Sequence, residues 1–280
     1  MKTMSFLEFL SALFGWIYTL SWSLSFYSQP LLNIRRKSTS GTTVDFPFIN
    51  TLGFLTYLIY NTVFYSSPVI RHQYALRNHD HTPAVAVNDI VFAAHAFVIC
   101  TILTTQYFFP SIWGFDHAPG TKPSRLILGI MSGSVVAVGI IILIVASVPP
   151  DADPKTSWAW LDVIYTLSYV KLLITLVKYA PQLLYNFRQR STKGWSIGQI
   201  LLDFLGGILS IAQIAIDSWL QGDWSGITGN PVKFALGNVS MLYDLVFMTQ
   251  HYVLYHDDGS DRDGERDSLL ERGDGSRRLD

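Results

Sequence analysis

Two lysines lie within a single apolar stretch of the chain, between residues 158 and 185. They belong to a run of polar side chains spaced by four, three, four and four residues: Lys171, Thr175, Lys178, Gln182 and Asn186. Residues at these steps share one face of an α-helix. Two ammonium groups on one face attract carboxylates, so the run predicts a binding site for a ligand that carries them. In the plainer alternative, the lysines only neutralise buried aspartates.

Three aspartates occur in other apolar stretches, namely Asp89, Asp203 and Asp244. Burial disfavours the charged form of a carboxyl, so each is a candidate to take up a proton near the pH of an acidic compartment. A neighbouring lysine would instead lower the pKa of the carboxyl, so the direction of the pKa shift stays open. The sequence shows neither a nucleophile–base pair nor a metal-binding cluster, so we expect no enzymatic activity, metal or cofactor.

The stretches that carry these residues are apolar and long. Hydrophobic residues make up 49% of the chain and charged residues 15%, below the roughly 25% of soluble domains. Seven stretches have the length of a membrane-spanning helix: 6–32, 47–65, 89–109, 126–148, 158–185, 197–220 and 234–255. The alternative is a soluble protein of seven buried helices, but the polar faces of soluble helices are missing. The sequence therefore predicts an all-α membrane protein.

A repeat organises these helices. Residues 25–41 resemble residues 178–194, and an offset of 153 pairs Gln29 with Gln182 and Asn50 with Asp203. Later, the string DIVF at Asp89 matches DLVF at Asp244, with the offset larger by two. We therefore predict two parallel three-helix repeats joined by a linking helix, an arrangement that commonly builds a transport pathway between its halves. A structural duplication without transport is the alternative.

The repeat sets the expected domain boundaries. Residues 1–110 form the first repeat, 111–157 the linking helix with its loops, and 158–255 the second repeat; residues 256–280 form a charged, disordered tail. Pro181 removes a helix hydrogen bond and predicts a kink, and Pro30 predicts another in the first repeat. Gly206 and Gly207 allow close packing of helices after Asp203.

The basic residues predict the topology. Lysine and arginine are more numerous in the loops after the first, third and fifth helices than on the other side, which places those loops and the tail in the cytosol. The N-terminus then lies in a lumen or outside the cell. With few, scattered basic residues and a formal net charge of −1, we expect no nucleic-acid partner. The single cysteine, Cys100, excludes an internal disulfide.

Three segments resemble the cystinosin family of the PQ-loop superfamily. They are the run that begins KYAPQ and continues through RSTKGWSIG to LLDFLGG, the string VNDIVFAAHA and the string YDLVFMTQHYVLY. The resemblance extends from about residue 14 to residue 255. It implies proton-coupled export of L-cystine from the lysosome or vacuole by alternating access in the lipid bilayer.

The resemblance also implies site residues. Cystine would be held by Asn50, Lys171, Lys178, Tyr179, Asn186 and Asp203, and proton coupling would involve Asp89, Asp203 and Asp244. Trp22 and Gln182 fall at pathway positions. Gln199 stands where the family usually has asparagine, which adds a methylene to the site, and Ser28 replaces the first-loop proline.

Two other functions remain open at this point. A PQ-loop transporter for cationic amino acids is one, although a stripe of lysines would repel its substrate. A cargo receptor similar to the KDEL-retrieval receptors is the other, and it would bind a peptide end without transporting it.

The tail contains a candidate sorting signal. Glu265 lies four residues before the leucine pair Leu269 and Leu270, a spacing that resembles acidic dileucine signals bound by cytosolic adaptors. Adjacent leucines in a charged tail gain nothing from a core, so a partner's pocket is a natural use for their apolar area. The plain alternative is a chance match.

Overall fold

The computed structural model describes residues 6–78, 80, 83, 85, 87–116, 118, 120–221 and 231–255, and its regular elements are all helices. In chain order they are α1 (Phe6–Arg36), α2 (Asp45–Ser66), α3 (Pro68–Arg77), α4 (Val87–Phe108), α5 (Pro110–Trp113), α6 (Arg125–Ser147), α7 (Trp160–Val177), α8 (Ala180–Gln189), α9 (Ile197–Gln221), α11 (Pro231–Thr249) and the π-helix η1 (Gln250–Leu254).

Five helices in the described part of the chain are long and apolar enough to cross a membrane. They are Phe6–Arg36, Asp89–Phe108, Arg125–Ser147, Trp160–Gln189 and Ile197–Leu220. The protein is therefore an all-helical membrane protein. The other two predicted spans coincide with α2 and α11, which are helical over 22 and 19 residues but are not among these five.

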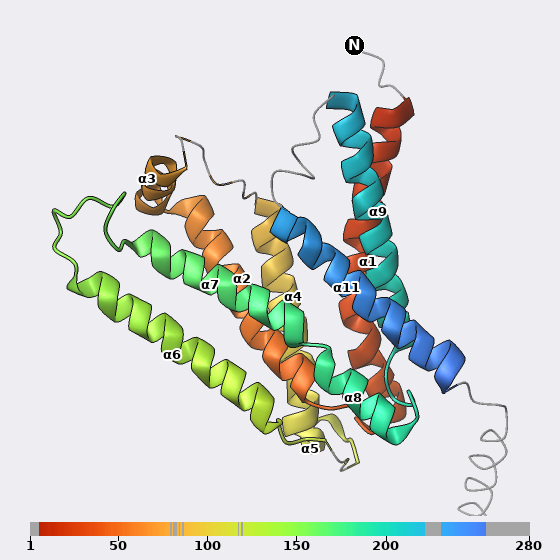
Figure 1. The fold of residues 1–280 in the computed structure, drawn as a ribbon. Coiled ribbons are helices and arrows are strands. Elements are labelled where there is room, and N and C mark those ends of the chain that lie inside the picture. The colour runs from red at the N-terminus through yellow and green to blue at the C-terminus, as the bar shows by residue number, and fades with distance from the viewer. Residues whose placement is uncertain are drawn as a thin grey trace, which may run out of the picture.

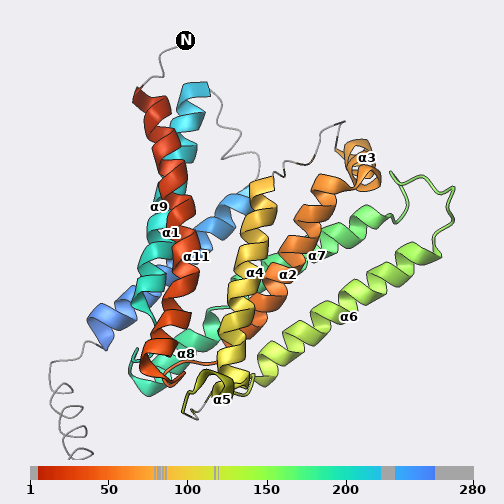
Figure 2. The same cartoon turned by 180° about the vertical axis from the view of Figure 1, so that it is seen from behind.

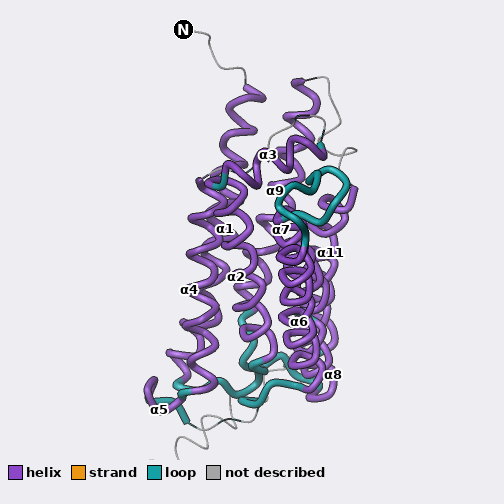
Figure 3. Tube along the Cα trace, turned by 90° about the vertical axis from the view of Figure 1, so that its left-hand side faces the viewer, coloured by secondary structure: helices purple, strands orange, loops and turns teal. Residues whose placement is uncertain are grey.

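Helices from the two halves of the chain pack against each other. Helix α1 lies along α9 over most of its length, and α2 lies between α4 and α7 (Figures 1 and 2). Helix α6 packs on α7 at the outer edge of the bundle. Seen from the side, the axes of the long helices are roughly aligned; loops lie at the end that carries α5 and α8, and a further loop lies near the opposite end (Figure 3). We call the end with α5 and α8 the α8 end, and the opposite end the α3 end.

Small residues allow α1 and α9 to approach closely. A side chain added at Gly206 would overlap the Trp22 ring, and one added at Gly15 would lie 2.9 Å from the Gln213 amide nitrogen. Ser21 and Ser25 are buried on α1. Small interfacial residues are typical of packed membrane helices, because they bring backbones together without a hydrophobic driving force.

The two prolines have different effects. Helix α7 ends at Val177 and α8 begins at Ala180, so Lys178 and Tyr179 lie in a break just before Pro181. Proline has no amide hydrogen, which explains the interruption. Helix α1, in contrast, is continuous through Pro30. The predicted kink is therefore an interruption of two residues, both with right-handed helical dihedral angles, in the second repeat, while the helix is continuous in the first.

Candidate functional site

A buried polar network lies at the α8 end of helix α1, in the first repeat. The Gln29 side-chain nitrogen donates to Asn33 Oδ1 at 2.9 Å and to the Gly194 carbonyl at 2.8 Å. The Gln29 oxygen accepts from the Ser196 amide at 2.7 Å. Asn33 Nδ2 donates to Gln106 Oε1 on α4 at 2.9 Å. This first network joins α1 and α4 to the α8–α9 loop of the other repeat.

The second repeat contains an equivalent network. The Gln182 side-chain nitrogen donates to Asn186 Oδ1 at 2.8 Å and to the Gly41 carbonyl at 3.3 Å. The Gln182 oxygen accepts from the Thr43 amide at 3.1 Å. Asn186 Nδ2 donates to Gln250 Oε1 at 3.1 Å. Gln182 and Asn186 thus hold the loop of the first repeat, and both side chains are fully buried.

A glycine from each repeat makes this exchange of loops possible. Gly41 and Gly194 have φ angles of +90° and +93°, in the left-handed region. A Cβ atom at Gly41 would overlap the Lys193 carbonyl, and one at Gly194 would overlap the Ser40 carbonyl. The two loops therefore pack against each other backbone to backbone, and only glycine fits at these positions without strain.

The register between α4 and α11 differs from the prediction. Asp89 lies in the first turn of α4, whereas Asp244 lies near the far end of α11, so the DIVF and DLVF strings do not occupy equivalent places. Helices α4 and α11 begin 144 residues apart (231 − 87), and the two network glutamines have the same separation (250 − 106). The predicted equivalence of Asp89 and Asp244 is wrong, because a similarity of four residues does not determine the register of two helices.

The two lysines lie beside aromatic rings. Lys171 Nζ is 3.8 Å from the centre of the Phe54 ring and 5.6 Å from that of Tyr57. Lys178 Nζ is 4.4 Å from the centre of the Tyr179 ring. Neither lysine forms an ion pair with a described carboxylate. Cation–π contacts of this kind are weaker than a salt bridge to an anionic ligand, so both ammonium groups are available to one.

Asn50 lies opposite these lysines. On α2, Phe46 stacks on the Tyr179 ring with centroids 5.2 Å apart, and Phe54 contacts Lys171. Asn50 is one turn from each phenylalanine and therefore shares their face. Its side chain is 1% exposed, and Oδ1 has no hydrogen-bond partner among the described residues. A buried acceptor without a donor costs about 1–3 kcal/mol, which a bound ligand can recover.

Two carboxyls from different helices complete the site. Asp203 Oδ2 accepts from Tyr179 OH at 3.0 Å and from Ser240 Oγ at 3.3 Å. Asp244 is fully buried, and neither of its carboxyl oxygens has a described partner. Trp22 donates from its indole to the Asp203 carbonyl at 3.2 Å. The structure thus brings Tyr179, Asp203 and Trp22 together.

Other site predictions have different outcomes. Gln199 is buried one turn before Asp203. Asp89 lies in the first turn of α4, at the opposite end of that helix from Gln106. The tail residues Glu265, Leu269 and Leu270 lie outside the described residues. Sequence reasoning missed Ser240 and Phe54, since a serine and a phenylalanine in an apolar helix carry no signal of their own.

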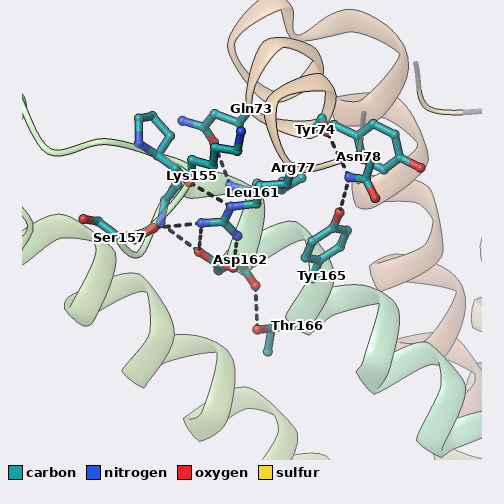
Figure 4. A network of polar contacts seen from close by, with 12 residues as sticks. Gln73, Tyr74, Arg77, Asn78, Lys155, Ser157, Leu161, Asp162, Tyr165 and Thr166 are labelled. Carbon is teal, nitrogen blue, oxygen red and sulfur yellow. Dashed lines mark hydrogen bonds and ion pairs between the residues drawn. The ribbon is translucent and has the colours of Figure 1, made fainter. Parts of the chain in front are cut away.

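A second polar cluster joins the repeats at the α3 end (Figure 4). Arg77 forms a bidentate ion pair with Asp162, at 2.6 and 3.0 Å, and also donates to the carbonyls of Pro154 and Ser157. Nearby, Gln73 Oε1 accepts from the Leu161 amide at 2.9 Å. The hydrogen bond to Asp162 raises the pKa of Arg77. This cluster ties α3 to the start of α7.

Comparison with known proteins agrees with the internal repeat. The PQ loop repeat family matches residues 10–70 and 163–223, two segments that are themselves 153 residues apart. The chain is 41% identical to a cystinosin homolog of Arabidopsis thaliana over 251 residues, 89% of this chain and 87% of the relative.

Relatives from animals and yeast are also similar. Identity to the cystinosin of Drosophila melanogaster is 40% over 249 residues, 89% of this chain and 59% of the relative. A protein of Saccharomyces cerevisiae described as a cystine transporter is 25% identical over 262 residues, 90% of this chain and 96% of that one. The chain spans about three fifths of the length of several relatives. Identity over nearly all of the bundle leaves one assignment: the chain belongs to the cystinosin family.

Proposed function

We propose that the protein exports L-cystine from the lumen of a lysosome or vacuole to the cytosol, together with protons. Seven membrane-spanning helices would form two parallel three-helix repeats joined by α6. The N-terminus would be lumenal, and the α8 end would be cytosolic. The proposal rests on family membership and on one observation above all: Lys178, Tyr179 and Asp203 lie together at the break in α7, since the Lys178 ammonium lies on the Tyr179 ring and the Tyr179 hydroxyl donates to Asp203.

Cystine matches these groups in charge. Its two carboxylates can bind Lys171 and Lys178, whose ammonium groups have no described carboxylate partner. An ammonium group of the ligand can bind Asp203, which hydroxyl groups already orient. Asn50 Oδ1 can accept a further hydrogen bond from an ammonium. Charge-assisted hydrogen bonds of this kind are about twice as strong as neutral ones. A zwitterion can form them with the lysines and with Asp203 at the same time, which a simple ion cannot.

The two glutamine networks support alternating access. Each network holds a loop of the opposite repeat, so together they close the bundle at the α8 end. Release of a ligand toward that end requires both networks to separate. The break at Lys178 and Tyr179 then supplies a hinge directly beside the ligand, because its residues are outside regular helix.

Asp203 and Asp244 divide the tasks of binding and proton carriage in this proposal. Asp203 receives two hydroxyl donors, which suits a carboxylate that binds an ammonium. Asp244 is buried without a described donor, which suits a carboxyl that is protonated in the closed state and ionises on opening. One proton crossing about two pH units releases roughly 2.7 kcal/mol, enough for about 100-fold accumulation.

Counterflow tests this function against the two alternatives. Proteoliposomes are preloaded with unlabelled cystine, lysine or a peptide with a free C-terminus, and entry of labelled cystine is followed. Only preloaded cystine should accelerate entry. Acceleration by lysine would favour a cationic amino-acid transporter. Saturable peptide binding without any flux would favour a cargo receptor.

A further inference from the structure

The break in α7 is held from a neighbouring helix. Tyr243 on α11 donates from its hydroxyl to the Leu176 carbonyl at 2.8 Å. Leu176 lies in the last turn of α7, where the break at Lys178 interrupts the regular sequence of backbone hydrogen bonds. The contact lies at the exposed surface of the bundle, where a membrane offers no water to satisfy such a carbonyl, so it needs another donor. The Tyr243 hydroxyl supplies one.

The same face of α11 contacts both sides of the break. Ser240 donates to Asp203, the Tyr243 ring lies 5.5 Å from that of Tyr179, and Phe247 packs on Tyr179 at the same distance. Residues 240, 243 and 247 are spaced as one helical face. Tyr179 is thus fixed by its hydroxyl to Asp203 and by its ring to α11. The Leu176 carbonyl bond fixes the other side of Lys178.

The first repeat lacks this contact. The separation of 144 residues between α4 and α11 places Ile99 where α11 has Tyr243 (243 − 144). Isoleucine has no hydroxyl to donate. The corresponding helix of the first repeat, α1, is not broken and carries no lysine at the equivalent depth. The hydroxyl and the break therefore occur together in one repeat and are absent together from the other.

We propose that Tyr243 is a positioning residue for substrate binding, which acts by holding the end of α7 so that Lys178 faces the ligand. This inference rests on the proposed function and deepens it. Lys178 sits between two anchors, the Leu176 carbonyl and the Tyr179 side chain. Removing the first anchor lets the Lys178 backbone turn about the break. The ligand carboxylate then loses its ammonium partner, while the ring packing of Tyr243 is unaffected.

The test is Tyr243→Phe, which removes only the hydroxyl, in proteoliposomes with labelled cystine. The KM should rise about 5- to 10-fold, with the maximal rate changed less than twofold. The advantage of cystine over cystine dimethyl ester as a competitor should shrink by a similar factor, because the ester lacks the carboxylates that Lys178 binds. Tyr169→Phe is the matched control, since Tyr169 is 65% exposed on α7. It should match the wild type.

The outcomes separate this inference from the function on which it rests. If the wild type transports cystine but Tyr243→Phe keeps its KM and its preference over the ester, the inference is wrong. A fall in melting temperature with equal losses for cystine and ester would also overturn it, because the hydroxyl would then serve only stability. Absence of cystine flux in the wild type would instead overturn the proposed function.

Discussion

Gln29 and Gln182 lie 153 residues apart and make the same set of hydrogen bonds, each to the loop of the other repeat. Each side chain donates to an asparagine one turn later and to a glycine carbonyl across the interface. Each accepts from a backbone amide of the opposite loop. A duplicated sequence has thus produced two reciprocal contacts that close one end of the bundle.

Because the two networks are equivalent, mutation of either glutamine should have the same effect on the stability of the protein. Gln29→Ala and Gln182→Ala should each destabilise the protein by about 1–3 kcal/mol, because both leave buried amides and carbonyls unpaired. Thermal unfolding in detergent measures this. Gln189→Ala, at an exposed site on α8, is the control and should be neutral. Strongly unequal losses would show that the two networks do not act as equivalents.

The contact between Arg77 and Asp162 predicts how the stability of the α3 end depends on pH. Its pKa is raised in the folded protein by the hydrogen bond to Asp162, so its contribution to stability is complete below the unfolded pKa and is lost only as pH rises through the folded one. Both values lie above the physiological range. Arg77→Met should therefore destabilise by about 1–3 kcal/mol, equally at pH 5.5 and pH 7.5.

The measurement is the melting temperature at each pH, with Arg71→Met, at an exposed site on α3, as the control. A loss at pH 7.5 that disappears at pH 5.5 would show that the contact does not persist in an acidic compartment.

Lys178 should be needed for binding rather than for folding. Lys178→Ala should abolish cystine transport while the protein still reaches its membrane, because a ligand carboxylate loses its ammonium partner. Lys122→Ala, at an exposed site, should transport normally. Wild-type protein inhibited as well by cystine dimethyl ester as by cystine would contradict the assignment.

The tail should determine the destination of the protein. Changing Leu269 and Leu270 to alanine should divert it toward the plasma membrane, since a sorting adaptor would lose its apolar contact. Fluorescence microscopy of the tagged full chain measures the location. Leu279→Ala provides a leucine control in the same tail. Unchanged lysosomal or vacuolar residence of the double variant would place the signal elsewhere.

Local patterns predicted much of the architecture. The offset of 153 follows from residues 25–41 and 178–194, and the break follows from Pro181, because both depend on short-range chemistry. The predicted lysine stripe is divided between two environments: Lys171 and Lys178 lie on aromatic rings, whereas Gln182 and Asn186 belong to the second network. The helix is interrupted between Lys171 and Gln182, and a pattern that assumes a continuous helix cannot show this.

Long-range register was harder to predict. Asp89 and Asp244 were paired through a four-residue string, although Gln106 and Gln250 are the equivalent residues. The triplets Thr105-Gln106-Tyr107 and Thr249-Gln250-His251 carried the correct signal. Tyr107 and His251 even repeat a contact, each with a threonine hydroxyl of a loop. Such pairings depend on tertiary packing, which similarity along the chain does not determine.

Simultaneous recording of cystine uptake and proton uptake in proteoliposomes tests the central claim most directly. With an acidic exterior, wild-type protein should move cystine and protons inward together, and each flux should need the other substrate. Asp203→Asn should lose proton-linked uptake, because the amide no longer provides a carboxylate for the ligand ammonium, while Asp153→Asn at an exposed loop site should not. Cystine flux without any proton flux, or cystine-driven proton flux that survives in Asp203→Asn, would contradict the account.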